Sequence, residues 1–417
     1  MKRLLALIVI FITGAQLTLA QETITPALEE HLEAIEQLTA KLRDLTPLRP
    51  VEHRFPARED VVTYLEREMN LQFDPQTLLR ETQFYIAFDL LPAEVDLQQV
   101  YLDFLSSPAG VGGFYDTDTQ GMNVLLVGGG ELGDKLPLLD QITYSHEYTH
   151  ALQDQHFDLD TLMPDAAGVA ANPDYALAVQ ALIEGDATAA MTVYLQTAAQ
   201  QNPMAALSIL TQGFTAGAFN IPKGTPPFIV TELSVPYQDG QTFVAAISRE
   251  GGWEAVNAAY AKLPTSTEQI MHPAKYQSGE QPQAVTLDTT APGESWERLA
   301  DRPLGEFYLR SYLDTQLGSS EANRAAAGWG GDRYHLYYNA ETDQRAWALR
   351  LVWDTPEDAT EFGEALTAFG DARFEGVTAA DGCWMGTSES LCVGCSGNTE
   401  TRVAVAPTVE MARRLLR

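Results

Sequence analysis

The chain has 417 residues, enough for two or three domains, and its 45% apolar and 20% charged residues exclude wholesale disorder. Acidic residues outnumber basic ones by 57 to 26, which gives a formal net charge of −31. Because so acidic a surface repels nucleic acid and anionic lipid, we expect neither as a partner.

Residues 1–20 have the layout of a secretory signal peptide. Lys2 and Arg3 form a basic start, residues 4–12 are an unbroken apolar run, and the small residues at 18–20 suit a cleavage site. The apolar run is shorter than the roughly 20 residues that span a bilayer, and no later segment is long and apolar enough to do so. We therefore predict an extracytoplasmic protein, secreted or held in the cell envelope, with no membrane span after cleavage. An uncleaved anchor is the alternative.

The first two thirds of the chain show the hydrophobic periodicity of helices. The predicted helices cover residues 22–45, 58–69, 78–105, 137–157, a long stretch from 172, 204–217, 238–249 and 253–262. Two short segments, 113–116 and 122–127, flank a turn rich in Asp, Thr and Gly and predict a β-hairpin. Asp116 and Asp118 are explained by turn chemistry without a calcium ion.

The last third changes character. Residues 277–292, with Gly, Pro and several Gln, are typical of a linker. The segments after it predict an alternation of strands and helices: strands at 334–338, 347–353 and 402–406, and helices at 355–369 and 408–416. We interpret Gly328 to Asp332 as a turn entering this part, which is therefore a small α+β domain.

All three cysteines lie near the C-terminal end. In an exported protein we expect one disulfide and one remaining thiol, and we favour a bridge between Cys383 and Cys392. The alternative is that Cys392 and Cys395 form a redox pair or half of a zinc site. No second pair of cysteines exists to complete such a metal site.

Residues 146–150 are His-Glu-Tyr-Thr-His, inside the predicted helix 137–157. Positions i and i+4 share a helix face, so both imidazoles can reach one ion. Glu147 is offset from that face and reaches a water at the metal instead. Zinc lowers the pKa of such a water to about 7, and a carboxylate can take its proton. The motif predicts a zinc site with ligands His146 and His150 and with Glu147 as the catalytic base.

The third ligand has two candidates. His156 has the spacing of an extended three-histidine motif, but that motif needs Gly three residues after the second His, and Gln153 stands there. A helix that continues through Gln153 turns His156 about 120° away from His150. Glu184 lies on an apolar face of the long helix, where a carboxylate is costly unless it is paired or metal-bound. We prefer Glu184 and keep His156 as the alternative.

The runs at residues 145–155 and 182–187 together resemble the gluzincin (peptidase MA-like) metallopeptidases, in which a His-Glu-x-x-His helix precedes a second helix with a Glu-Gly-x-Ala segment. More narrowly they resemble a group of uncharacterised exported bacterial proteins, to which segments 113–116, 266–273 and 328–332 are also similar. The resemblance implies zinc ligands at His146, His150 and Glu184, with Glu147 as the base.

The sequence departs from the family in two places. Many gluzincins have an Asp four residues after the ligand Glu, whereas this chain has Thr188 there and Asp186 nearby. The longer gap between His150 and Glu184 leaves an insertion at about 158–172.

The resemblance implies an α+β chain whose main part is a mainly helical zincin-like domain with a small antiparallel sheet. We predict a signal peptide, a helical N-terminal segment, a catalytic domain and an α+β C-terminal domain, with bounds 1–20, 21–105, 106–290 and 291–417.

The expected activity is hydrolysis of peptide bonds in a peptide or protein substrate. His272 and Tyr276 are candidates for stabilising the oxyanion, and the strand at 122–127 is a candidate for aligning an extended substrate. The alternative is an inactive zinc-binding envelope protein that interacts with a partner.

Overall fold

The structure is a computed structural model that describes residues 24–72, 74–107, 110–126, 131–204, 207, 222–375, 380–395 and 397–417. The predicted signal peptide 1–20 and nearly all of the predicted helix 204–217 lie outside these residues. The chain forms two compact units. The first comprises Met1–Asp74, Asp96–Val169 and Ala176–Pro264, and the second comprises Pro75–Val95, Ala170–Tyr175 and Thr265–Arg417.

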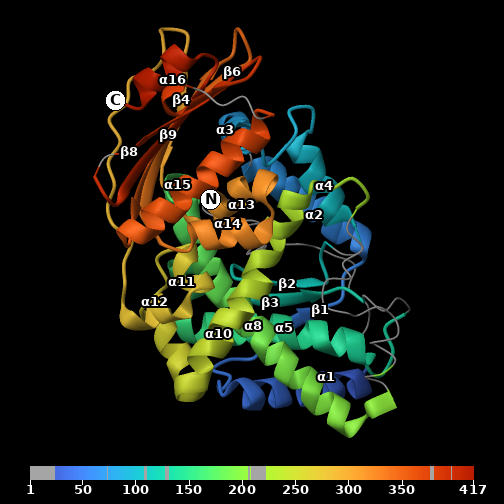
Figure 1. Cartoon of the computed structure of the whole chain (residues 1–417). Helices are drawn as coiled ribbons and strands as arrows, with labels where there is room; N and C mark the ends of the chain where they lie inside the picture. The colour runs from blue at the N-terminus through green and yellow to red at the C-terminus, as the bar shows by residue number, and fades with distance from the viewer. Residues whose placement is uncertain are drawn as a thin grey trace. The chain divides into compact units, whose positions relative to one another are not determined.

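The first unit is mainly helical, with a small sheet (Figure 1). Its described elements, two of which extend across its bounds, are α1 (Pro26–Arg43), β1 (Glu52–Arg54), α2 (Arg58–Gln72), α4 (Leu97–Ser106), β2 (Gly113–Asp116), β3 (Gly121–Val124), α5 (Leu138–Phe157), α6 (Leu159–Leu162), α7 (Ala166–Ala171), α8 (Pro173–Gln201) and α10 (Pro227–Ala261).

The sheet of this unit has the order β1-β3-β2 in the described part of the chain. β2 and β3 form the predicted hairpin, and the Asp116 carboxylate accepts backbone N–H groups of Asp118 and Thr119 as turn chemistry requires. β1 pairs with β3 in parallel, so the prediction of an antiparallel sheet is wrong in this respect. β1 has only three residues and lies far from the hairpin in sequence, so no local pattern marks it.

The pairing of β3 corrects a second expectation. A strand with neighbours on both sides has no free edge for an added substrate strand, so the segment 122–127 does not fit that role. β2 is the outer strand on the hairpin side among the described residues. One face of β2 and β3 packs against α5, and α1 packs against α5 in turn. Their shared core includes Leu32, Met122 and Leu152, each fully buried.

α8 and α10 meet at backbone distance. A Cβ added to Gly185 in α8 would lie 2.1 Å from the carbonyl carbon of Gly240 in α10, so only glycine allows this approach. α10 is interrupted at Gly251 and Gly252, whose backbone angles are not helical. This kink separates the predicted helices 238–249 and 253–262. The first of them begins earlier than predicted and contains Pro236.

The second unit combines helices with a larger sheet (Figure 1). Its described elements are α3 (Pro75–Ala87), α11 (Thr267–Met271), α12 (Pro273–Ser278), β4 (Glu297–Arg302), α13 (Glu306–Leu317), α14 (Ser319–Ala326), β5 (Trp329–Asn339), β6 (Gln344–Trp353), α15 (Pro356–Arg373), the 3₁₀ turn η1 (Ala380–Gly382), β7 (Cys383–Met385), β8 (Ser390–Cys395), β9 (Glu400–Ala406) and α16 (Val409–Leu415).

Its strands are antiparallel in the order β4-β5-β6-β9-β8-β7 across the described residues. The indole of Trp347 in β6 donates to the Ala87 carbonyl at 2.9 Å and stacks on Phe88 with ring centroids 4.6 Å apart. α3 thus belongs to this unit, and the predicted N-terminal segment 21–105 does not form a unit of its own. The boundary also falls after Pro264 and not at 290, because α11 and α12 pack with this unit.

Two features of the second unit bear on the sequence predictions. The segment Gly328 to Asp332 does not form a simple turn, because Trp329 already begins β5. The buried Asp332 carboxylate accepts the backbone N–H groups of Leu304 and Gly305 just before α13, where a negative charge is favourable. The predicted disulfide between Cys383 and Cys392 is confirmed and joins facing residues of β7 and β8.

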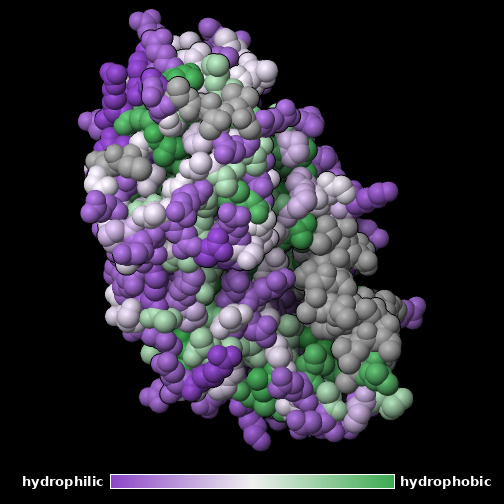
Figure 2. Space-filling view, in the orientation of Figure 1, coloured by the Kyte–Doolittle hydropathy of each residue, from purple (hydrophilic) through white to green (hydrophobic). Residues whose placement is uncertain are grey.

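The α+β class is confirmed by these two units. No helix within the described ranges is both long and apolar enough to cross a membrane. The face of the molecule seen in Figure 2 is dominated by hydrophilic side chains, in line with the net charge of −31.

Candidate metal centre

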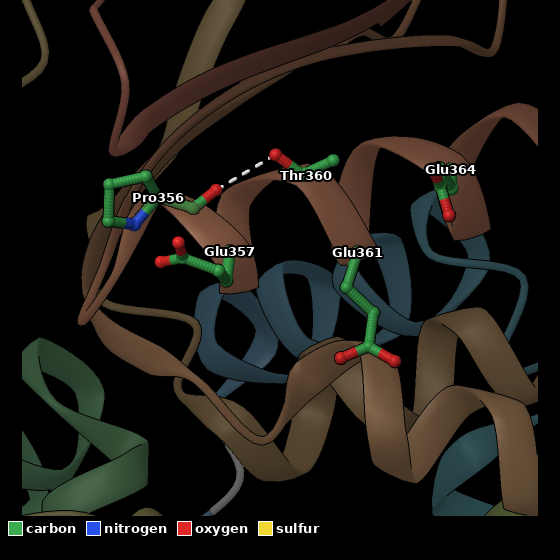
Figure 3. Close-up of a pocket in the computed structure, with 5 residues that line it drawn as sticks. All are labelled: Pro356, Glu357, Thr360, Glu361 and Glu364. Atoms are coloured by element: carbon green, nitrogen blue, oxygen red, sulfur yellow. Dashed lines mark hydrogen bonds between the residues drawn. The ribbon is translucent and has the colours of Figure 1, made fainter.

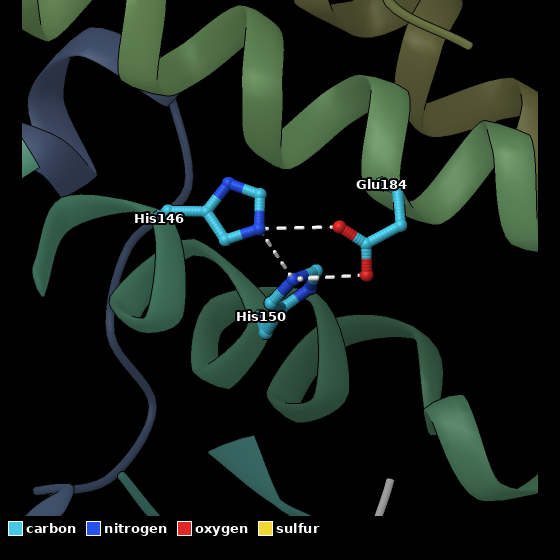
Figure 4. A group of neighbouring side chains, drawn as sticks. All are labelled: His146, His150 and Glu184. Carbon is cyan, nitrogen blue, oxygen red and sulfur yellow. Dashed lines mark hydrogen bonds and ion pairs between the residues drawn. The ribbon is translucent and has the colours of Figure 1, made fainter. Parts of the chain in front are cut away.

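The two histidines of the motif lie on consecutive turns of α5. The helix runs without a break from Leu138 to Phe157, and it places the Nε2 atoms of His146 and His150 3.1 Å apart (Figure 4). The spacing of four residues produces this convergence, because one helical turn is 3.6 residues. Both imidazoles are largely buried, His150 at 3% exposure.

Glu184 of α8 completes the group. Its Oε2 lies 3.1 Å from Nε2 of His146, and its Oε1 lies 3.4 Å from Nε2 of His150 (Figure 4). Ligand atoms of a tetrahedral zinc site are about 3.3 Å apart, since each lies roughly 2.0–2.1 Å from the ion. Two imidazoles and one carboxylate are also a ligand set of catalytic zinc. In both spacing and chemistry, the three side chains fit this metal.

The electrostatics show how strongly the three groups interact. Burial lowers the pKa of His150, but Glu184 more than offsets this and raises it to about 9. Burial raises the pKa of Glu184, but the two histidines outweigh the effect of burial and lower this pKa to about 2. A carboxylate exposed by only 1% is thus kept ionised by its imidazole neighbours.

Glu147 lies beside this group and is 5% exposed. Burial raises the pKa of its carboxyl group, opposed by the nearby His146 and His150 and by a hydrogen bond from the backbone N–H of Tyr115. A Cβ on Gly113 would lie 2.9 Å from Cγ of Glu147. Glycine at the start of β2 therefore makes room for the Glu147 side chain.

His156, the other candidate for third ligand, lies away from the group. As expected for a helix that continues through Gln153, its Nε2 interacts with the carbonyl of Thr46 at 2.8 Å. Gln153 itself is fully buried, and its Oε1 lies 2.8 Å from Nδ1 of His150.

Tyr237 of α10 is a residue that sequence reasoning missed. Its ring lies over His146 with centroids 6.1 Å apart and an interplanar angle of 30°. Burial, Glu184 and Glu147 together raise the pKa of its phenol well above the usual value. No local pattern marks Tyr237, because it comes to the site only through the close packing of α8 and α10.

His272 and Tyr276 belong to the second unit. His272 follows α11, and its Nε2 lies 2.9 Å from Oε1 of the buried Glu306. Tyr276 in α12 is 9% exposed. A role for either residue at the oxyanion stays a prediction.

Two other groups of acidic side chains lie in the second unit, and the first of them already surrounds a cation. The carboxylates of Glu268, Glu280 and Asp354 gather around the ammonium group of Lys275, which is their common ion-pair partner. A surface pocket of about 390 Å³ lies along α15 (Figure 3), and its lining residues are Pro356, Glu357, Thr360, Glu361 and Glu364.

Comparisons with known proteins concern mainly the second unit. A family described as Domain of unknown function (DUF8575) matches residues 296–416. The match leaves out His146, His150 and Glu184. No curated protein and no solved structure matches the chain. These comparisons name no activity for the chain.

Proposed function

We propose that the chain is a zinc metallopeptidase of the gluzincin type with a zincin-like catalytic domain. The observation that carries the proposal is that donor atoms of His146, His150 and Glu184 lie within 4.8 Å of one another, with Glu147 buried beside them. Zinc bound by these residues would polarise the substrate carbonyl and acidify a water molecule.

The residues of the chain would divide the remaining work. Glu147 takes a proton from the attacking water and delivers it to the leaving amine, which is general acid–base catalysis by one carboxylate. Tyr237 has its ring over His146 and its phenol within the electrostatic reach of Glu184 and Glu147, so it is suited to donate a hydrogen bond to the oxyanion. His272, held by Glu306, remains a second candidate for that donor.

An extended peptide would be aligned by main-chain hydrogen bonds along the outer edge of β2. This strand is supported for the role because Gly113 contacts the Glu147 side chain and Tyr115 donates its backbone N–H to the same carboxylate. A peptide on this edge would therefore lie next to the catalytic base.

The competing proposal is an inactive zinc-binding envelope protein. A structural zinc site has no need of an additional buried carboxylate, and burying one without a purpose is costly. Glu147 therefore favours the enzyme. The disulfide between Cys383 and Cys392 supports export, because such bonds persist in oxidising compartments.

A peptide-library digest with Glu147→Gln as the matched variant tests the proposal. The native chain should cleave peptides and lose this activity to a chelator. Glu147→Gln should still bind one zinc per chain but cleave at least about 100-fold more slowly, because an amide cannot accept the proton. Cleavage that survives both the chelator and the substitution would refute the mechanism. Stoichiometric zinc without any cleavage would favour the envelope protein.

A further inference from the structure

A chain of buried polar contacts leads from His150 to the N-terminal helix α1. It begins where Nδ1 of His150, the ring nitrogen that faces away from Glu184 and His146, lies 2.8 Å from Oε1 of Gln153. It continues through Asp186 of α8 and ends at Arg43, the last residue of α1. Gln153, Asp186 and Arg43 are each 0% exposed.

The orientation of the Gln153 amide is determined by its partners. Its Nε2 lies 3.0 Å from the carbonyl oxygen of Ile183 and 3.0 Å from Oδ2 of Asp186. A carbonyl only accepts hydrogen bonds, so this end of the amide must be the NH₂ group. Oε1 therefore faces His150, whose Nδ1 must donate. The Nε2 lone pair of a neutral His150 is consequently directed at the group formed with His146 and Glu184.

Asp186 is held in place by charge. Nε and Nη2 of Arg43 donate to its two carboxylate oxygens at 2.5 and 2.9 Å, and the Tyr260 hydroxyl donates to Oδ2 at 2.7 Å. Arg43 is itself held by Asn257, at 2.7 Å, and by the face of the Trp253 ring, 4.5 Å from Cζ. A buried ion pair that loses one partner leaves an uncompensated charge, so neither residue is replaceable without cost.

We propose that Arg43, Asp186 and Gln153 are positioning residues that fix the ring and the tautomer of His150. α1 thereby contributes to the metal centre, and zinc affinity depends on the contact of its last residue, Arg43, with Asp186 of α8. This inference rests on the proposed zinc site. This chain has Thr188 where many gluzincins have an Asp, and Asp186 acts instead on the second histidine through Gln153.

The test measures zinc affinity by competition with a chromogenic chelator. Gln153→Met keeps the side-chain volume and removes the hydrogen bonds, Asp186→Asn removes the charge, and Arg43→Met removes the distant end of the chain of contacts. Each should raise the zinc Kd about 10–100-fold, the usual cost of losing an outer partner of a metal-binding histidine. Arg43→Lys should bind zinc more tightly than Arg43→Met and less tightly than the native chain, because lysine keeps the positive charge but cannot make the two-pronged contact with Asp186.

Two further measurements separate positioning from general stability. The Arg43→Met, Gln153→Met double variant should raise the zinc Kd no more than the Gln153→Met variant, because Arg43 reaches His150 only through Asp186 and Gln153 and the two effects are therefore not independent. In the Co²⁺-loaded protein, the exchangeable Nδ1 proton of His150 should exchange with solvent faster in Gln153→Met than in the native chain.

The matched control is Arg302→Met. Arg302 also forms a buried two-pronged ion pair, with the Glu81 carboxylate at 2.8 and 2.9 Å, but in the second unit. It should lower stability and leave zinc affinity within about twofold of native. The inference falls if Arg43→Met binds zinc as tightly as the native chain, or if Arg302→Met weakens binding equally. A native chain that binds no zinc would overturn the proposed function as well.

Discussion

Replacing Gly185 by alanine should separate the two helices that bring Glu184 and Tyr237 together. An added Cβ would lie 2.1, 2.2 and 2.7 Å from the carbonyl carbon, carbonyl oxygen and Cα of Gly240. Cβ atoms essentially never approach another atom closer than 3.0 Å. All three neighbouring atoms belong to backbone, so no side-chain rotation relieves the contact. α10 would have to move away from α8.

The magnitude follows from two opposing terms. Alanine is favoured over glycine by about 0.8–1.0 kcal/mol in a helix interior. Overpacking a filled interior usually costs about 1–3 kcal/mol, and the upper part of this range, about 2–3 kcal/mol, applies here because the obstacle is the backbone of a second helix. We therefore expect the free energy of unfolding of the first unit to fall by about 1–2 kcal/mol in spite of the better helix former. Zinc affinity should fall with it, because Glu184 is the adjacent residue.

The assay compares Gly185→Ala with Gly363→Ala in urea unfolding followed by circular dichroism. Gly363 lies inside α15, and a Cβ added there meets nothing within 4 Å. The same substitution at that position should therefore stabilise the chain by up to about 1 kcal/mol. The opposite signs isolate the helix contact from helix propensity. Equal stabilisation by both substitutions would show that α8 and α10 do not meet as described.

Three further predictions concern the site and its surroundings. Zinc content after dialysis against a weak chelator should fall steeply in Glu184→Ala and stay native in His156→Ala. The reverse result would show that His156, and not Glu184, is the third zinc ligand. Tyr237→Phe should lower kcat about 100-fold with little change in KM if its hydroxyl stabilises the oxyanion, whereas a larger loss in His272→Ala would move that role to the second unit. Burial lowers the pKa of His53, but two glutamates of α1 outweigh this and raise it above 6.5, so the stability it contributes is complete below pH 6.5 and is lost as pH rises through the raised value. The difference in unfolding free energy between native and His53→Gln protein should shrink over that range, and a difference independent of pH would refute the assignment.

The sequence by itself determined the features that depend on neighbouring residues. The spacing of His146 and His150 predicts convergence because helical periodicity is local. Glutamine at position 153 predicts that α5 continues and carries His156 away, and both are observed. The hairpin at 113–124 was predictable for the same reason, since its turn residues are contiguous.

Other features have no local signature. β1 is three residues long, and its parallel partner β3 lies more than 60 residues later in the chain, so no local pattern connects them. α3 has the hydrophobic periodicity of a helix, as the helices before it do. It nevertheless packs on β6 of the second unit, where Phe88, the residue after α3, stacks on Trp347. Hydrophobic periodicity predicts that a helix buries one face, but it does not predict which other element covers that face.

Only the tertiary structure decided which distant residues complete the candidate site. Tyr237 reaches His146 because Gly185 and Gly240 let two helix backbones touch. Arg43, at the end of α1, donates to Asp186, which lies 143 residues later in the chain, and no sequence motif connects the two positions. Such contacts are selected by the fit of whole surfaces and by the cost of leaving a buried charge unpaired, and both are properties of the packed chain and not of any short segment.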